Sequence, residues 1–363
     1  MLYSFLFLIN KYIGFNIFER LLSLYEEKYI KKYISKKEVR AQEIPTINAT
    51  ELTEEIFEQL SDNYRKPVLI KGYLKDTNAV KSWTENYLKE IIDDDFNIKT
   101  FVLNDGKLDV EHNRFTDIID NMKTDNIYIN NESSIISTYP QLLNDIKDKF
   151  ISFIETLKNS GLRNIHHTHL FIGYNTVSKI SGTNMHCAGT GNFFCMIKGC
   201  KKWTLIDPKY SIFLKGRVSQ SGIHAQTLID MPDTDISVEP DILHHLPRYE
   251  IVLEPGDILW NAPWWWHRIK NINEKDEYNI GMAIRHSKVS TINLKNNLLY
   301  TISGSIYLVY NSFFLSLYER LFMKKYEITK LDDNKMILLK EIDELTKKYP
   351  KTYELTLTKD KDQ

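Results

Sequence analysis

The sequence predicts a mainly β core with helical flanks. Between residues 166 and 285, short apolar or alternating runs are separated by turn residues. Short strands without intervening helices favour a β-sandwich or barrel over βαβ units. The predicted strands are His169–Tyr174, Asn192–Ile197, Lys202–Ile206, Glu250–Leu253, Asp257–Asn261 and Tyr278–Arg285.

Helical patterns lie on both sides of this β region. We expect four parts: an N-terminal helical segment (1–40), an α/β flank (41–160), the β domain (161–290) and a C-terminal helical region (291–363). The flank opens after Pro45, which disfavours helix at the residue before it. Its predicted helices are 51–60, 78–92 and 139–158, and its predicted strands are 67–72 and 97–103.

Composition indicates a globular chain with no excess of basic residues. Of 363 residues, 47 are Lys or Arg and 48 are Asp or Glu, and 42% are hydrophobic. A protein that binds nucleic acid by neutralising phosphates shows a basic surplus, so no nucleic-acid surface is expected. The spacing of Cys187, Cys195 and Cys200 fits neither a disulfide framework nor a CxxC zinc pair. We therefore expect a reducing, cytoplasmic location.

The two ends of the chain have amphipathic segments. Residues 2–9 are apolar but lack the basic region and cleavage site of a signal peptide. Residues 296–318 carry no charge, yet their Ser, Thr and Asn content favours a helix buried against the protein or a subunit partner over a membrane span. The segments 18–25 and 315–322 have apolar residues at helical spacing. These terminal helices either pack together or lie jointly on a membrane.

Two histidines stand out in the β region. His186 and His267 are 81 residues apart, and only a closed or two-sheet β fold can bring them together. A pair of neutral imidazoles can bind iron, zinc, copper or nickel. From the residues alone, two satisfied core or surface histidines fit equally well. The neighbouring Trp264, Trp265 and Trp266 could likewise be packing residues.

The context of the histidines follows a longer pattern. It reads Thr-x-x-His-x-x-x-x-x-Asn-Phe-Phe-x-x-Ile-Lys-Gly-x-Lys from Thr183 to Lys201, followed by Pro-Gly-Asp and Trp-Trp-His ending at His267. It resembles the cupin-like JmjC family of Fe(II)- and 2-oxoglutarate-dependent oxygenases, in the branch with the asparaginyl hydroxylase of hypoxia-inducible factor. The similarity covers about 67–103 and 166–286. It implies a double-stranded β-helix, or jelly roll, and a homodimer formed through C-terminal helices.

The resemblance also implies site residues and cofactors. His186 and His267 match the metal histidines. Lys201 matches the lysine that pairs with the far carboxylate of 2-oxoglutarate, Thr183 matches a hydroxyl donor to that carboxylate, and Asn192 matches a polar residue of the same pocket. The implied cofactors are therefore Fe(II) and 2-oxoglutarate, and the implied activity is hydroxylation of a protein or other macromolecule, with a small-molecule substrate also open.

The chain departs from the family pattern at Ala188. The family has Asp or Glu there as its third metal ligand, and Cys187 cannot replace it because neighbouring side chains on a strand point to opposite faces. Three alternatives follow. The protein is an oxygenase with two-histidine iron, a halogenase that binds halide at the vacant position, or a non-catalytic relative that acts by binding.

Other aromatic and histidine clusters have weaker interpretations. Trp260 and Trp264–Trp266 are expected to crowd the approach to His267 and keep it dry. His244 and His245 are expected in a solvated loop, and a structural role is expected for His166, His167 and His169.

Overall fold

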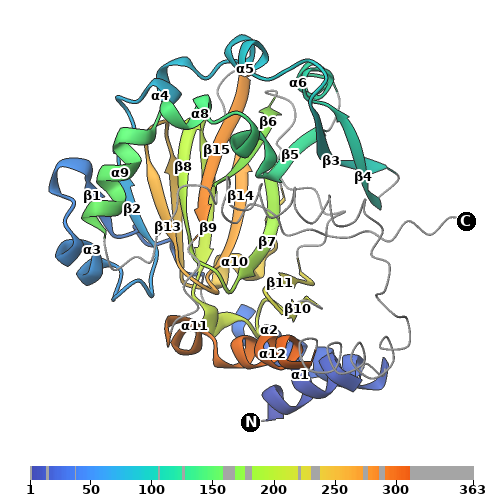
Figure 1. The fold of residues 1–363 in the computed structure, drawn as a ribbon. Helices are drawn as coiled ribbons and strands as arrows, with labels where there is room; N and C mark the ends of the chain where they lie inside the picture. The colour runs from blue at the N-terminus through green and yellow to red at the C-terminus, as the bar shows by residue number, and fades with distance from the viewer. Residues whose placement is uncertain are drawn as a thin grey trace, which may run out of the picture.

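The structure consists of two β-sheets that face each other, with helices on their outer sides (Figure 1). It is a computed structural model, and it describes residues 2–13, 16–36, 38–104, 107–124, 127–157, 168–175, 182–219, 222–229, 238–272, 277–285 and 291–310. Every structural statement below concerns these residues.

The larger sheet has nine strands among the described residues. Their order is β1 (Thr46–Asn48), β2 (Val68–Lys71), β13 (Ile258–Asn261), β8 (Asn192–Lys198), β15 (Glu277–Arg285), β6 (Thr168–Asn175), β5 (Ile127–Glu132), β3 (Asn97–Asn104) and β4 (Lys107–Arg114). Only the β1–β2 pair is parallel.

The smaller sheet has six strands in the described part of the chain, all antiparallel. Their order is β10 (Gly216–Val218), β11 (His224–Thr227), β7 (Gly182–Ala188), β14 (Trp266–Asn271), β9 (Lys201–Ile206) and β12 (Arg248–Leu253). The chain passes between sheets from β8 to β9 and again from β13 to β14. This is the predicted jelly roll, and all six predicted strands of its core are present.

The flank is richer in structure than predicted. It contributes strands β1 to β5 to the large sheet, so it shares that sheet with the β domain. The prediction of one helix over 139–158 in an otherwise irregular segment is wrong. The segment contains β4 and β5 and the helices α6 (Phe115–Asn121), α7 (Ser134–Thr138), α8 (Gln141–Asn144) and α9 (Lys147–Thr156).

The predicted helix 78–92 is two helices, α4 (Asn78–Ser82) and α5 (Glu85–Ile91). The break occurs because Thr84 is the N-cap of α5 and its side chain accepts a hydrogen bond from the backbone N–H of Tyr87. Trp83 is buried at the break and donates its indole N–H to Asp145. The cap and the buried indole together outweigh the continuous helical periodicity.

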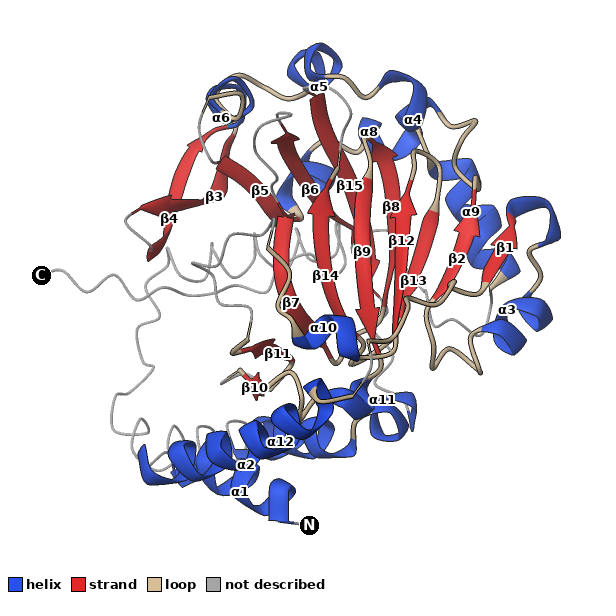
Figure 2. Cartoon of the chain, turned by 180° about the vertical axis from the view of Figure 1, so that it is seen from behind, coloured by secondary structure: helices blue, strands red, loops and turns tan. Residues whose placement is uncertain are grey.

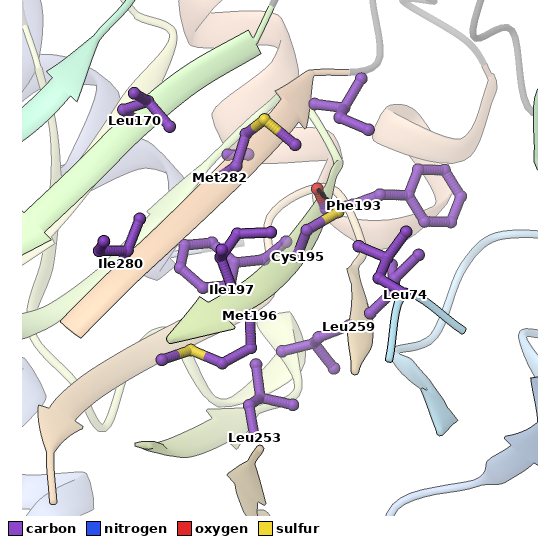
Figure 3. Close-up of a cluster of buried hydrophobic side chains, with 14 of the residues drawn as sticks. Leu74, Leu170, Phe193, Cys195, Met196, Ile197, Leu253, Leu259, Ile280 and Met282 are labelled. Atoms are coloured by element: carbon purple, nitrogen blue, oxygen red, sulfur yellow. Dashed lines mark hydrogen bonds between the residues drawn. The ribbon is translucent and has the colours of Figure 1, made fainter. Parts of the chain in front are cut away.

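The main core covers the outer face of the large sheet and also extends between the two sheets. Phe193 of β8 packs against Phe153 of α9 with ring centroids 5.0 Å apart, and against Phe57 of α3 (Glu54–Leu60). Figure 3 shows further apolar side chains of this core, among them Cys195 and Met282. The helices thus cover the outer face of this sheet and leave its inner face toward the small sheet.

Helices at one end of the molecule (Figure 2) enclose a second core against the small sheet. It is covered by α1 (Leu2–Ile13), α2 (Asn16–Ile34), α10 (Ile242–His245) and α12 (Leu298–Tyr310), with α11 (Thr291–Asn296) beside α12. The Phe7 ring stacks on Tyr300 at 5.4 Å, and the Tyr12 hydroxyl donates to the Ser303 carbonyl at 2.6 Å. The N-terminal helices therefore pack on α12, whereas the predicted segment 315–322 lies outside the described residues.

No helix in the described part of the chain has both the length and the apolar character needed to cross a bilayer.

An ion-pair cluster fastens α2 to the small sheet. Arg217 of β10 donates two hydrogen bonds to the Glu26 carboxylate, at 2.8 and 2.9 Å, and also bonds Glu19. The Glu26 side chain is fully buried. Its burial raises the pKa of the carboxyl, while Arg217 opposes that rise. Removal of Arg217 would leave a buried carboxylate without its main partner.

We expect Arg217→Met to lower the free energy of unfolding by about 3 kcal/mol, because it strands the buried Glu26 charge. Urea denaturation measures this. The control Arg114→Met removes an exposed pair with Asp117 and should cost less than about 1 kcal/mol. Adding Glu26→Gln to Arg217→Met should recover part of the loss. Equal losses for the two single variants would contradict the assignment.

Candidate functional site

The candidate site lies on the inner face of the small sheet, where strands β9, β14 and β7 are adjacent. Cross-strand pairing arranges their side chains in three rows. The first row contains Leu205, His267 and His186; the second Trp203, Ile269 and Thr183; the third Lys201 and Asn271. Paired residues in antiparallel strands share a face. The two histidines and Lys201 therefore face the same interior, two rows apart.

A bulge makes this arrangement possible. Between His267 and Ile269 the β14–β7 register shifts, so that two steps along β14 correspond to three along β7. Without the bulge, Thr183 and His186, three residues apart, would point to opposite faces. The extra residue places Thr183 on the same side as His186.

Both histidines are held at their Nδ1 atoms by backbone carbonyl oxygens. The Nδ1 of His186 lies 2.8 Å from the Asn184 carbonyl oxygen, and the Nδ1 of His267 lies 2.9 Å from the Trp265 carbonyl oxygen. Because a carbonyl oxygen only accepts, each Nδ1 carries a hydrogen, and in the neutral ring the lone pair is then on Nε2. This is the tautomer that metal-binding histidines use.

The two imidazoles are close, and His267 is neutral. Their ring centroids are 4.1 Å apart. Burial, followed by the proximity of His186, lowers the pKa of His267 well below its ordinary value. Trp203 stacks on the His267 ring at 5.5 Å, and the Asn261 amide nitrogen lies 3.5 Å from its Nε2. Two neutral imidazole nitrogens side by side suit a divalent cation.

Lys201 is a buried cation at the other end of the site. Its side chain is 1% exposed, and its ammonium donates to the Asn271 side-chain oxygen at 2.5 Å. Among the described residues, no acid forms an ion pair with it. Burial lowers the pKa of Lys201 from 10.5 to about 7. A buried ammonium without a counter-charge is costly, so this end of the site suits a ligand anion.

The surroundings of Lys201 come from the large sheet. The ammonium lies 5.8 Å from the centre of the Tyr128 ring. Tyr128 occupies the space above Gly173, where any added Cβ would lie 2.8 Å from the tyrosine ring. Gly173 pairs with both Tyr128 and Asn279. The glycine thus admits the tyrosine that covers Lys201.

Several buried polar atoms on these facing surfaces have no hydrogen-bond partner among the described residues. Buried polar groups are normally paired, and each exception needs an explanation. Because these atoms gather between the sheets, a polar ligand accounts for them better than scattered defects do. They are the Thr183 Oγ1, the Asn192 Oδ1, the Asn261 Oδ1, the Trp203 Nε1 and both amide atoms of Asn279.

Ala188 lies where a third metal ligand would be expected. It is half-buried on the same face as His186, while Cys187 between them is buried in the second core. Burial raises the pKa of the Cys187 thiol well above its ordinary value, so Cys187 is not a thiolate ligand. Across the described residues, no set of three His, Cys, Asp or Glu side chains could hold a metal. The donor set fits a cation with two protein ligands and further ligands from outside.

The strand next to Ala188 carries two polar residues that sequence reasoning missed. His224 of β11 is the cross-strand partner of Ala188, and Gln226 is the partner of His186. Both therefore face the site side of the sheet. His224 is half-buried and Gln226 is exposed. They form the open edge of the site.

The tryptophan prediction is wrong. Trp260 packs on the outer face of the large sheet and donates to the Tyr64 carbonyl, and Trp265 donates to the Arg65 carbonyl. Trp264 and Trp266 contact Tyr300 in the second core. The indole at the histidines is Trp203 instead. Alternation along β13 and β14 turns Trp260 and Trp266 outward when Asn261 and His267 face inward.

His244 and His245 lie apart from the site, whereas His169 lies on the inner face of the large sheet. His244 and His245 belong to helix α10, not to a solvated loop, and the Nδ1 of His245 is 3.0 Å from the Lys36 carbonyl. His169 has its Nδ1 3.4 Å from the Asn131 carbonyl, while His166 and His167 lie outside the described residues.

The comparison with known families agrees with this geometry. Residues 53–291 match the sequence profile of the cupin-like domain, which is more than half of the chain. The chain belongs to the cupin-like domain family. This family, with its JmjC members, commonly includes oxygenases that use Fe(II) and 2-oxoglutarate. The narrower placement beside the asparaginyl hydroxylase stays a prediction.

Two similar proteins come from Dictyostelium discoideum. The chain is 25% identical over 236 residues to JmjC domain-containing protein E, which is 57% of this chain and 61% of that protein. It is 28% identical over 92 residues to JmjC domain-containing protein D, or 25% of this chain and 20% of that protein. The chain thus spans less than two thirds of the length of either relative.

Local sequence signals identify only part of the site. His186, Thr183, Asn192, Lys201 and His267 were named from the motif, and the structure places all five between the sheets. Asn271 could have been found, because it lies four residues after His267 and therefore shares its face. Tyr128 and His224 come from strands that no periodic pattern predicted.

The buried charge of Lys201 gives a stability prediction. Its folded-state pKa is depressed, so between about pH 7 and pH 10.5 the unfolded chain binds more protons and stability rises with pH. Without ligand, the free energy of unfolding of Lys201→Met should exceed that of the wild type by about 3 kcal/mol at pH 6. This difference should be smaller at pH 9. Urea denaturation at both pH values tests this.

The matched control is Lys198→Met, which lies three residues earlier in the same β8–β9 connection and is half-buried. The free energy of unfolding of this control should differ from that of the wild type by the same amount at both pH values. A Lys201→Met variant that is less stable than the wild type at pH 6 would contradict the assignment.

Proposed function

We propose that this protein is a hydroxylase that uses Fe(II) and 2-oxoglutarate and acts on a protein or other macromolecular substrate. His186 and His267 would hold the iron. Lys201 and Thr183 would bind the far carboxylate of 2-oxoglutarate, and Asn192 would line the same pocket. The family supports the class of chemistry, and the geometry of these residues supports the assignment of roles.

The observation that carries the proposal is Lys201. A fully buried lysine without an acidic partner among the described residues is a net cost to the fold unless a ligand supplies the negative charge. The ligand must also reach the face on which the His186 and His267 rings lie 4.1 Å apart, each with its Nδ1 held by a backbone carbonyl. A dicarboxylate with a metal-chelating 2-oxo acid at one end meets both demands.

The protein residues then have distinct tasks. Lys201 donates to one carboxylate and Asn271 fixes the direction of its ammonium. Trp203 and Phe194, whose rings are 5.0 Å apart, fill the space between the sheets and exclude water. His224 and Gln226 stand at the open edge, where they would contact the substrate. When bound, iron and 2-oxoglutarate supply oxidation in which one O2 atom enters a substrate C–H bond, the other enters succinate, and carbon dioxide leaves.

Two other functions are compatible with Ala188. A site with one acid fewer binds a cation less tightly, which favours a non-catalytic binding protein. The small side chain also leaves room for a halide, which favours a halogenase. A binding protein does not need the Lys201 end of the site, whereas a halogenase that uses 2-oxoglutarate would need it as a hydroxylase does. Lys201 therefore favours an enzyme over a binding protein. Hydroxylation is the conclusion because the halogenase alternative depends on Ala188 alone.

Metal content and turnover separate these functions. The purified full chain is loaded with Fe(II) anaerobically, its bound metal is measured, and succinate is followed in the presence of oxygen, ascorbate and 2-oxoglutarate. A hydroxylase binds iron and forms succinate. Iron and 2-oxoglutarate binding without succinate for any candidate substrate supports the binding protein, and halide-dependent turnover supports the halogenase.

Binding of 2-oxoglutarate should depend on pH through Lys201. The free lysine is half-charged near pH 7 and must be charged to pair with a carboxylate, so affinity should fall as pH rises above about 7. At pH 8, calorimetry in two buffers of different ionisation enthalpy should reveal uptake of up to one proton. Lys201→Met should bind at least tenfold more weakly. Binding unaffected by this change would overturn the assigned role.

Restoring the acid should strengthen metal binding. In Ala188→Asp a carboxylate would stand on the face of His186, and we expect at least a tenfold rise in Fe(II) or Mn(II) affinity, measured by competition with a chelator. Ala188→Asn is the matched control, because it has the same shape without the charge and should give a smaller gain. No gain from the aspartate would show that the metal is not bound beside position 188.

A further inference from the structure

The helices that cover the small sheet leave an apolar surface exposed. The structure exposes sixteen large hydrophobic side chains among the described residues, and ten of them lie on α1, α2, α11 and α12. These helices form one layer at the end of the molecule that also holds the N-terminus (Figures 1 and 2). The ten residues are Leu2, Phe5, Tyr12, Ile17, Leu21, Leu24, Tyr29, Leu294, Leu298 and Ile302.

Each of three helices shows its exposed residues as a stripe. On α1 they are Leu2, Phe5 and Tyr12; on α2, Ile17, Leu21 and Leu24; on α12, Leu298 and Ile302. These spacings place each set on one side of its helix. Phe7, Leu22 and Tyr300 are buried in the second core and hold the opposite sides. The stripes therefore point away from the protein.

The charges of α2 are sorted between its two faces. Its acidic residues are Glu19, Glu26 and Glu27, and each is paired with Arg217 or Lys215 of the adjoining sheet region. At 100° per residue, four exposed cations instead lie within the exposed apolar stripe of α2 or beside it. They are Arg20, Lys28, Lys31 and Lys32. The outward face of α2 is thus apolar and positive, with its acids neutralised on the inward side.

We propose that this helical layer, defined as α1, α2 and α12, docks on the surface of a membrane that contains anionic lipids. An amphipathic helix with Leu and Phe on one face and flanking Lys and Arg lies in the interface plane, with its apolar side chains among the acyl chains. The lysine stems extend toward the headgroups and their ammonium groups pair with lipid phosphate or carboxylate. The layer has no membrane-spanning helix and would bind peripherally.

The same charges argue against a second copy as the occupant. In a two-fold symmetric dimer the same surface meets itself, so Arg20, Lys28, Lys31 and Lys32 would face their own equivalents or lie close to them. Like charges in a contact are unfavourable, and Glu27, the acid nearest this face of α2, is already paired with Lys215. An anionic surface satisfies both the apolar stripe and its cations.

The test is flotation of the purified full chain with vesicles. We expect it to bind vesicles of phosphatidylcholine with phosphatidylserine, to bind phosphatidylcholine alone more weakly, and to lose affinity as salt is raised. Leu21→Ser with Leu24→Ser should lower the partition coefficient at least tenfold. Lys28→Glu with Lys31→Glu should lower it about thirtyfold on anionic vesicles. These side chains are exposed, so the variants should fold, which circular dichroism checks.

The matched control is Ile151→Ser with Lys147→Glu on α9. It also changes one exposed apolar and one exposed basic residue at helical spacing, but on the helix that packs against the large sheet. It should bind like the wild type. Absence of flotation with anionic vesicles would overturn the proposal. So would a loss of vesicle binding in the control variant that equals the loss in the α2 variants. Dimers that dissociate on Leu21→Ser with Leu24→Ser, without vesicle binding, would assign the layer to contact between copies instead.

Discussion

The register between β7 and β14 is the constraint on which the candidate site depends. It places His186 directly across from His267, and its bulge turns Thr183 to the same side. Because the side-chain period of a strand is two, a slip of one residue would move His186 into the second core and Cys187 toward the site. The apolar Met185 and Cys187, packed against the terminal helices, oppose such a slip. Core packing on one face thus fixes chemistry on the other.

The two ends of the site suit ligands of opposite charge. At the histidine end, burial keeps His267 neutral, which is the form that binds a cation. At the lysine end, burial weakens the charge that an anion needs, and only part of the cost is offset by Asn271. A ligand that is an anion at both ends and chelates a metal at one of them satisfies both ends together. That coupling explains why an arrangement costly to the empty fold is consistent with a binding site.

The sequence predicted the jelly roll and the motif residues because both have local signals. Turn-separated short runs identify β8, β9 and β13, and the spacing from Thr183 to Lys201 matches the family motif, which spans β7, β8 and the start of β9. The face of a strand on which each side chain lies was harder to predict from the sequence. Trp260 and Trp266 are the sequence neighbours of Asn261 and His267, which face inward. Their nearness in sequence suggested that they line the site. Because side chains alternate along a strand, both tryptophans lie in the outer cores instead. Tyr128 lies above Lys201 only because Gly173, on a paired strand, leaves space for it.

Strand β7 connects the site with the terminal helices. His186 and Ala188 face the interior, while Met185 and Cys187 contact the core formed with α1, α2 and α12. Trp264 adds a second connection, since its indole donates to Thr301 of α12 and its backbone N–H donates to the Ala188 carbonyl. The helical layer is therefore connected to the backbone at Ala188 through strand β7 and through Trp264. The helices that carry the exposed apolar and basic surface thus share a packed core with the strand that holds Ala188.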